Sequence, residues 1–147
     1  MSLSKITTKG RYARRMMVDL AEQETRNYIS LKDVAGRQDI SKKYLEQIVP
    51  ALTQAGLLTT ERGPLGGYRL ARSPDQITAG DILRVTEGSF THVTCVDVPG
   101  SCERSSECPT ISIWQGLSDV VEKYLDGITL RDIVERQKES YSNSWII

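Results

Sequence analysis

The first part of the chain carries apolar residues at helical spacing. A stripe of them predicts a helix from about residue 8 to residue 24. Ser30 is a suitable N-cap for a short second helix, and Ser41 for a third helix that runs from about residue 42 to residue 54. The tight turn between these two helices lies at residues 39–41. Such a pair forms a helix-turn-helix pattern, which many helical proteins contain.

A β-hairpin is predicted directly after the third helix. Residues 57–61 and 68–70 have strand character, and the segment between them is rich in Gly and Pro, which supply turn geometry. Within the third helix, Pro50 is expected to kink it or to end its regular part, and Gly56 suits the position just beyond its end. A hairpin in this place is a wing, at about residues 57–70. Residues 1–76 are therefore interpreted as a winged helix-turn-helix domain.

The rest of the chain is predicted to be mainly helical. Thr78 caps a helix that ends near Gly88, a long apolar stripe predicts a helix from about Thr110 to Leu125, and Thr129 begins a last helix. We interpret residues 77–139 as a second unit, with a cysteine-containing loop and long helices. Residues 140–147 are expected to form a mobile C-terminal tail. The predicted fold class is mainly α with a small β wing.

The charges are segregated between the two halves of the chain. Residues 1–72 carry 13 Lys/Arg and 7 Asp/Glu, whereas residues 73–147 carry 6 Lys/Arg and 12 Asp/Glu, although the formal net charge is zero. This asymmetry indicates a basic half that faces a polyanion. We expect no transmembrane helix and no signal peptide, hence a cytoplasmic protein that does not bind membranes. With one histidine and no phosphate-binding glycine loop, an enzyme is not expected.

The exposed face of the predicted helix-turn-helix offers candidate DNA contacts. The third helix has Lys42, Lys43, Glu46 and Gln47 on its outer face, and Arg62 lies at the base of the wing. From there an arginine can reach a phosphate or the minor groove. The alternatives are a solvated surface acid at Glu46 and an ordinary exposed arginine at Arg62.

Three cysteines lie close together in the second half, at Cys95, Cys102 and Cys108. An odd, clustered set in a cytoplasmic chain favours metal ligation or redox chemistry over a disulfide framework. Zinc, or three reduced cysteines with no metal, remain alternatives.

Four segments in the same order resemble one family. They are TTKGRYA near the start, SKKYLEQIVPALTQAGLL in the third helix, RGPLGGY in the wing and ITAGDILRVTEG after it. Over about residues 5–135 the chain resembles the IscR, NsrR and CymR group of transcription regulators. The resemblance implies a winged helix-turn-helix fold, a long dimerisation helix from about Thr110, and a homodimer on double-stranded DNA that presents two recognition helices to successive major grooves.

The same resemblance implies roles for individual residues. Glu46 and Gln47 correspond to base-reading residues, and Arg62 to the arginine that enters the minor groove. An N-terminal segment corresponds to one that contacts the DNA backbone. The full set of residues assigned to DNA binding is Lys9, Arg11, Tyr12, Lys42, Lys43, Tyr44, Glu46, Gln47, Arg62 and Gly63.

The cysteine spacing resembles the iron–sulfur loop of IscR-type and NsrR-type members, which implies a cluster, 2Fe-2S before 4Fe-4S. Three cysteines leave one ligand to be found. IscR-type proteins use a histidine where this chain has Ile111, and NsrR-type proteins use a carboxylate where it has Arg11. Candidate fourth ligands are His92 first, then Glu103 and Glu107, and the alternatives are a water, a small thiol or no permanent ligand.

Two other functions are kept as alternatives. Segments of the chain also look like CymR-type members, which regulate cysteine metabolism, lack the three-cysteine loop and bind cysteine synthase. The last four residues, SWII, resemble the Ile-terminated tails that enter cysteine synthase, which makes Ile147 a candidate contact and the cysteines candidate thiol sensors. The alternative from another class is an iron–sulfur carrier or metal-binding adaptor.

Overall fold

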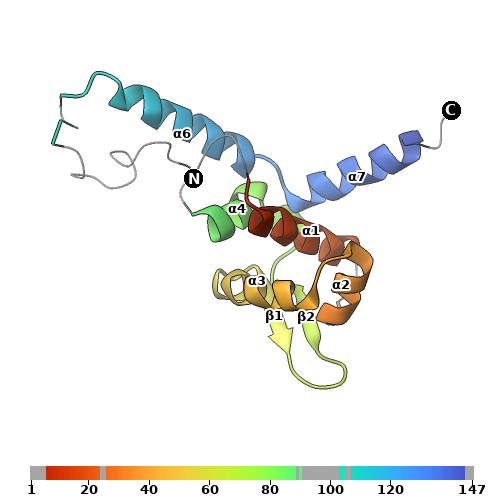
Figure 1. Cartoon of the computed structure of the whole chain (residues 1–147). Coiled ribbons are helices and arrows are strands. Elements are labelled where there is room, and N and C mark those ends of the chain that lie inside the picture. Colours follow the sequence, from red (N-terminus) through yellow and green to blue (C-terminus); the bar gives the residue numbers. More distant parts are fainter. Residues whose placement is uncertain (1–5, 24–25, 89, 91–102, 105–106, 145–147) are drawn as a thin grey trace.

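The computed structural model describes residues 6–23, 26–88, 90, 103–104 and 107–144. Within them the elements are α1 (Thr8–Glu22), α2 (Leu31–Gln38), α3 (Lys42–Gln54), β1 (Leu58–Glu61), β2 (Gly67–Leu70), the short 3₁₀ helix η1 (Pro74–Gln76), α4 (Ala79–Glu87), α6 (Ile111–Asp126) and α7 (Leu130–Ser144). Figure 1 shows a body made of α1 to α4 and the hairpin, with α6 and α7 extending from it in opposite directions. The fold is mainly helical with a small wing, as predicted.

Side-chain caps begin the helices where the sequence places them. The hydroxyl of Ser30 accepts a hydrogen bond from the Asp33 N–H at 3.1 Å, and that of Ser41 accepts one from the Tyr44 N–H at 3.2 Å. Each cap satisfies a backbone donor that has no partner within its own helix. The start of α4 has a reciprocal capping box with Asp81, so the predicted cap at Thr78 is confirmed.

Two left-handed residues turn the chain before and after α3. Asp39 has a φ of 52° between α2 and α3, and Gly56 has a φ of 77° after α3. At the second turn the N–H of Leu57 donates to the carbonyl of Leu52 at 3.0 Å, as in a Schellman motif. Gly56 therefore occupies the position predicted for it. Pro50 does not end α3, which continues to Gln54.

The hairpin is fixed to the segment that precedes α2. β1 and β2 are antiparallel, and Ile29 forms an isolated bridge to Tyr68 with N–H···O distances of 2.9 and 2.8 Å. Next to this bridge Gly67 has a φ of 146°, and a Cβ atom there would overlap the carbonyl oxygen of Ile29. Only glycine meets both requirements at that position. The base of the wing is thus held against the helix-turn-helix.

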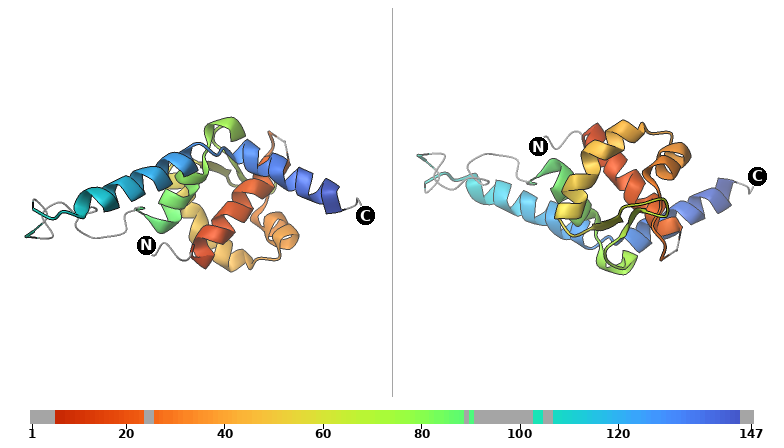
Figure 2. Two further views of the ribbon diagram at one scale, coloured as in Figure 1. Left: turned by 90° about the horizontal axis from the view of Figure 1, so that it is seen from above. Right: turned by 90° about the horizontal axis from the view of Figure 1, so that it is seen from below.

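One apolar core joins the two predicted parts of the chain. Leu45 of α3 and Met16 of α1 belong to the same buried cluster as Ile77, Ile82 and Leu130. The core therefore crosses residue 76. Figure 2, seen from above, shows α4 and α7 against α1, and both helices contact it. The outer helices are thereby seated on the helix-turn-helix rather than linked to it by a free tether.

The structure differs from the prediction at several helix boundaries. α7 continues to Ser144, so the C-terminal tail predicted from Ser140 was placed too early. No Gly or Pro lies between residues 130 and 144 to break the helix. α1 ends at Glu22 rather than near residue 24. Among the described residues, none of the helices is long and apolar enough to cross a membrane.

Candidate nucleic-acid interface

The amphipathic sequence of α3 separates a buried face from an exposed polar face. Its inner residues, Leu45, Ile48, Val49 and Leu52, are buried in the core. The opposite face is exposed to solvent and carries Lys42, Lys43, Glu46 and Gln47. On that face the Nζ atom of Lys42 lies 3.9 Å from Oε1 of Glu46, one helical turn away. Such an exposed pair contributes little to stability, so both side chains can exchange this contact for another partner.

The start of α1 lies against the start of α3. The rings of Tyr12 and Tyr44 meet edge-on, with centroids 5.2 Å apart. Both rings are half-buried, whereas Arg11 beside Tyr12 is exposed and donates a 3.3 Å hydrogen bond to the hydroxyl of Thr8. Lys9 is half-buried on the same turn of helix. The predicted N-terminal contact segment is thus next to the polar helix face.

A carboxylate from α4 holds the first turn of α1 in place. Oε1 of Glu87 accepts hydrogen bonds from the Thr7 hydroxyl at 2.6 Å and from the Thr7 N–H at 3.0 Å. The Thr7 hydroxyl in turn accepts from the Gly10 N–H at 3.1 Å, and a Cβ atom at Gly10 would overlap the Glu87 carboxylate. A helix beyond the wing therefore positions the basic N-terminal segment.

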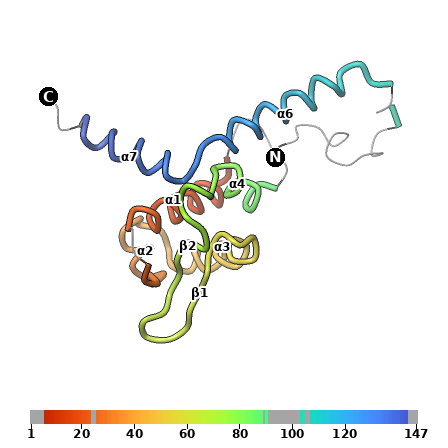
Figure 3. Tube along the Cα trace, turned by 180° about the vertical axis from the view of Figure 1, so that it is seen from behind, coloured from red at the N-terminus to blue at the C-terminus, as the bar shows by residue number. Residues whose placement is uncertain are grey.

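The wing loop projects from the body with its predicted residues exposed (Figure 3). Gly63 has a φ of 112°, and its carbonyl accepts a 3.0 Å hydrogen bond from the Gly66 N–H, which closes the loop. Arg62 makes no ion pair with any residue that the structure describes. Leu65 at the loop tip is 90% exposed. The wing therefore presents a guanidinium and an apolar side chain to solvent.

A buried ion pair sets α2 against α1. The Asp19 carboxylate is 1% exposed and accepts hydrogen bonds from Arg37 Nη2 at 2.7 Å and from Gln38 Nε2 at 2.9 Å. The hydrogen bond to Asp19 raises the pKa of Arg37 above its ordinary value. The sequence analysis did not identify this pair. The sequence feature that could have indicated it is Asp19, an acidic residue three positions after Met16 within the apolar stripe of α1.

A second ion pair connects α4 to the end of α6. Arg84 Nη2 lies 2.6 Å from Oδ2 of Asp126. The hydrogen bond from Arg84 lowers the pKa of the Asp126 carboxyl, because it favours the charged form. Together with the buried Phe90, whose ring lies 5.4 Å from the Arg84 guanidinium, this contact orients the long helix relative to the body.

Only part of the cysteine region falls within the described residues. Cys95, Cys102 and His92 lie outside them. Cys108 is a free, half-buried thiol whose Sγ is 3.2 Å from Oγ1 of Thr110, and this hydrogen bond lowers its pKa. Glu107 is exposed nearby, as is Glu103. No group of three or more metal-binding side chains occurs among the residues that the structure describes.

Comparisons with known proteins identify relatives along almost the whole chain. A family model described as Rrf2, iron-dependent transcriptional regulator, matches residues 6–136. The regulator IscR of Aliivibrio salmonicida is 38% identical over 130 residues, which span 88% of this chain and 77% of that protein. The regulator CymR of Bacillus subtilis is 39% identical over 140 residues, which span 93% of this chain and 96% of that protein.

Solved structures agree with these relatives. The structure of CymR, described as the global cysteine regulator of B. subtilis, has a TM-score of 0.71 and 40% identity, and covers 90% of this chain and 97% of its own. T. potens IscR has a TM-score of 0.72 and 38% identity, with 92% of this chain and 90% of its own covered.

Proposed function

Because the chain belongs to the Rrf2 family of transcriptional regulators, which are not enzymes, we propose that it reads double-stranded DNA as a homodimer through α3 and the wing. The observation that carries the proposal is the exposed polar face of α3, flanked by the start of α1 and by a wing arginine that forms no ion pair with the described residues. These three parts belong to the basic half of the chain. Family membership also favours a regulator over the iron–sulfur carrier or adaptor alternative.

The exposed side chains of α3 are suited to two kinds of DNA contact, with phosphates and with bases. Lys42 and Lys43 are suited to phosphates, which position the protein without reading sequence. Glu46 can accept from the amino group of cytosine, and Gln47 can pair with adenine in the major groove. The Lys42–Glu46 contact at 3.9 Å is replaced when the lysine binds a phosphate. Sequence specificity therefore rests on Glu46 and Gln47.

The flanking residues anchor the helix in the groove. Arg62 inserts into the minor groove, and Gly63 lets the wing backbone approach the DNA closely. Lys9 and Arg11 contact the phosphate backbone, and Tyr12 supports them by packing on Tyr44. Acting on chromosomal DNA places the protein in the bacterial cytoplasm.

The exposed apolar face of α6 supports dimerisation. Ile113, Val120 and Tyr124 are 59%, 66% and 65% exposed, and their spacing puts them on one side of the helix. A second copy covers this stripe, since an apolar face of this kind marks an interaction surface. The dimer then presents two copies of α3 about 34–36 Å apart, one helical turn of DNA. Light scattering should give a dimer for the protein and a monomer for Val120→Asp.

Selection of bound fragments from a bacterial genome at fixed salt tests the DNA-reading function. The protein should retain a limited set of fragments that share a roughly palindromic site. Arg62→Ala should bind that site about 1–3 kcal/mol more weakly. Arg136→Ala, an exposed arginine on α7, is the matched control and should bind as the unmodified protein does. Retention no better than for random DNA would overturn the proposal.

We further propose that Cys95, Cys102 and Cys108 hold an iron–sulfur cluster, 2Fe-2S in type, with His92 as the first candidate for the fourth ligand. Within the described residues, Cys108 fits this role because its thiol is free and only half-buried. When bound, the cluster supplies sensitivity to iron and to oxidants. Cys108 precedes the first residue of α6 by three positions, so tying it down fixes the start of that helix. Regulation then requires two dimer states that differ in stability.

An ultraviolet–visible spectrum of protein purified without oxygen, with iron and sulfide assays, tests the cluster. Visible absorption should be present in the protein and lost in Cys108→Ala, while Ser112→Ala, a nearby exposed residue, keeps it. A colourless, iron-free protein that still binds DNA would contradict the cluster and leave DNA binding intact. The cysteines would then be thiol sensors or zinc ligands.

The similarity to CymR favours a second candidate signal, cysteine supply. Identity to B. subtilis CymR is 39% and spans 96% of that protein. Under this proposal the C-terminal segment with Ile147, which lies outside the described residues, binds cysteine synthase. Calorimetry with cysteine synthase should show binding that is lost when Ile147 is deleted. Unchanged binding after the deletion, or none at all, would end this proposal.

A further inference from the structure

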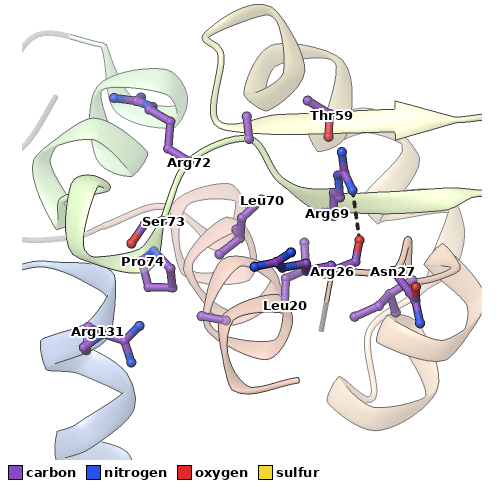
Figure 4. A pocket seen from close by; sticks show the side chains of 13 residues that line it. Leu20, Arg26, Asn27, Thr59, Arg69, Leu70, Arg72, Ser73, Pro74 and Arg131 are labelled. Carbon is purple, nitrogen blue, oxygen red and sulfur yellow. Dashed lines mark hydrogen bonds between the residues drawn. The ribbon is translucent and has the colours of Figure 1, made fainter. Parts of the chain in front are cut away.

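A large cavity lies beside the hairpin, where β1 and β2 meet the end of α1 and the start of α7. Its volume is about 800 Å³, it is open to solvent on one side, and the end of α1, the segment before α2, the hairpin and the start of α7 line it (Figure 4). This is within the range of small-molecule sites, roughly 300–1,000 Å³. Among the described residues that line it none is acidic, and four are arginines: Arg26, Arg69, Arg72 and Arg131.

Two of these arginines face the cavity from opposite sides. Figure 4 shows the side chains of Arg26 and Arg131 extending toward one another across it. Arg131 Nε forms an ion pair with Oδ1 of Asp75 at 2.9 Å, so this guanidinium already has one carboxylate partner, which holds the side chain and leaves its terminal nitrogens without a described partner. The Arg26 side chain makes no ion pair with any described residue. Two guanidinium groups held apart in this way suit a molecule with more than one anionic group.

A third arginine is fixed at the wall of the cavity. The Arg69 guanidinium lies 4.5 Å from the centre of the Tyr28 ring, and its Nη1 donates to the carbonyl of Arg26 at 2.9 Å. These contacts hold the loop that carries Arg26. They also keep a positive charge at the cavity that no described carboxylate neutralises.

A buried hydroxyl lines the same wall without a partner. Thr59 is the cross-strand neighbour of Arg69, and its Oγ1 atom is buried with no hydrogen bond to any described residue. A buried polar atom without a partner is uncommon and destabilising, so this hydroxyl is free to bond to a group of a bound molecule. Leu58, the preceding residue of β1, is buried in the core, so Thr59 faces the opposite side of the hairpin.

We propose that this cavity binds a small metabolite with two or more carboxylate or phosphate groups. Arg26 and Arg131 each hold one anionic group, Arg69 contributes charge from the wall, and the Thr59 hydroxyl donates a hydrogen bond to the bound molecule. The ligand connects the base of the wing to the start of α7. None of the described residues that line the cavity belongs to α3, so binding there does not depend on the proposed DNA reading.

Calorimetry on the full chain, with citrate and inorganic pyrophosphate as probes at constant ionic strength, tests the site. At least one probe should bind saturably, one per chain, and the comparison separates carboxylate from phosphate ligands. Arg26→Gln should weaken binding about tenfold, the effect of losing one charge-assisted hydrogen bond. Arg136→Gln, an exposed arginine outside the cavity, should leave it unchanged. Absence of saturable binding by both probes, or equal losses in the two variants, would overturn the proposal.

Thr59→Val gives a second and independent test. Without anion this variant should melt at a higher temperature, because an unpaired buried hydroxyl is replaced by a methyl group of similar size. Its rise in melting temperature on addition of the anion should be smaller than that of the unmodified protein. If Arg26 instead contacts a DNA phosphate, Arg26→Gln would lower DNA affinity and neither probe would bind, which would also overturn the proposal.

Discussion

The ring of Tyr44, at the start of α3, meets the ring of Tyr12 in α1 edge-on, with an interplanar angle of 81° and a centroid distance of 5.2 Å. This contact places the basic N-terminal segment beside α3. The Arg15 guanidinium also contacts the Tyr12 ring, 5.6 Å from its centre. Two segments that are far apart in the chain thus form one surface.

Removing the Tyr12 ring should weaken both stability and DNA binding. Tyr12→Ala should lower the free energy of unfolding by at least about 1 kcal/mol, since an edge-to-face pair contributes ~0.5–1.5 kcal/mol beyond its buried area. Tyr12→Phe keeps the ring and should fold as the unmodified protein does. Urea denaturation and fluorescence anisotropy with a selected DNA site measure the two effects. Equal behaviour of the Ala and Phe variants would show that the ring contact contributes nothing.

Removing Arg37, the exposed partner of the buried Asp19, should lower the stability of the protein. Arg37→Ala leaves the Asp19 carboxylate, 1% exposed, with Gln38 as its remaining described donor, and should destabilise the protein by about 3 kcal/mol. The double variant Asp19→Ala/Arg37→Ala should be less destabilised than the sum of the single variants, because no buried charge remains. A double-mutant cycle by chemical denaturation measures the coupling. If the losses of stability in the two single variants simply add up in the double variant, the two residues are not energetically coupled.

Lowering the pH should weaken the Arg84–Asp126 ion pair between α4 and α6. The pKa of Asp126 is lowered in the folded state by the hydrogen bond from Arg84, so its stabilising effect is full above the unfolded pKa, about 3.9. It is lost as the pH falls through the lower, folded pKa. Asp126→Asn should therefore flatten the decline of stability below about pH 4. Asp119→Asn, at an exposed position on the same helix, is the control, and an identical acid decline in both would contradict this.

Binding assays should distinguish the proposed base contacts of α3 from its proposed phosphate contacts. Glu46→Ala should relax the preference at one base pair, by about 1–3 kcal/mol of discrimination. Lys43→Ala should weaken binding evenly across sequences and reduce the salt slope by about 1. Anisotropy titrations at several salt concentrations, on the selected site and on single-base variants, measure both. A uniform loss in Glu46→Ala would remove Glu46 from the base-reading residues.

Substitution by alanine should change the stability of the protein in opposite directions at two glycines. Gly67→Ala should destabilise by at least about 2 kcal/mol, because the residue has a φ of 146° and its Cβ would overlap the Ile29 carbonyl. Gly36→Ala should stabilise by up to about 1 kcal/mol, because a Cβ there meets open space on α2. Thermal denaturation of both variants checks the pair. A tolerated alanine at Gly67 would show that the wing is not fixed to Ile29.

The sequence by itself determined the elements and their order. The caps at Ser30, Ser41 and Thr78, the glycine after α3 and the turn before β2 are all local signals, because each depends on residues a few positions apart. The polar face of α3 followed from helical periodicity alone. The end of α7 was not predicted because no helix-breaking Gly or Pro marks it. Where a helix has no such residue, its end depends on tertiary packing and solvation rather than on a local sequence signal.

Only the tertiary structure decided which distant residues meet. Asp19 and Arg37 are 18 positions apart, and the sequence offered a charge in an apolar stripe but not its partner. The four arginines of the cavity come from three separate segments, none of which has a motif. Their convergence depends on how α1, the hairpin and α7 pack on one core. That packing is set by buried surface shared among all the elements, whereas capping and periodicity act within one element at a time.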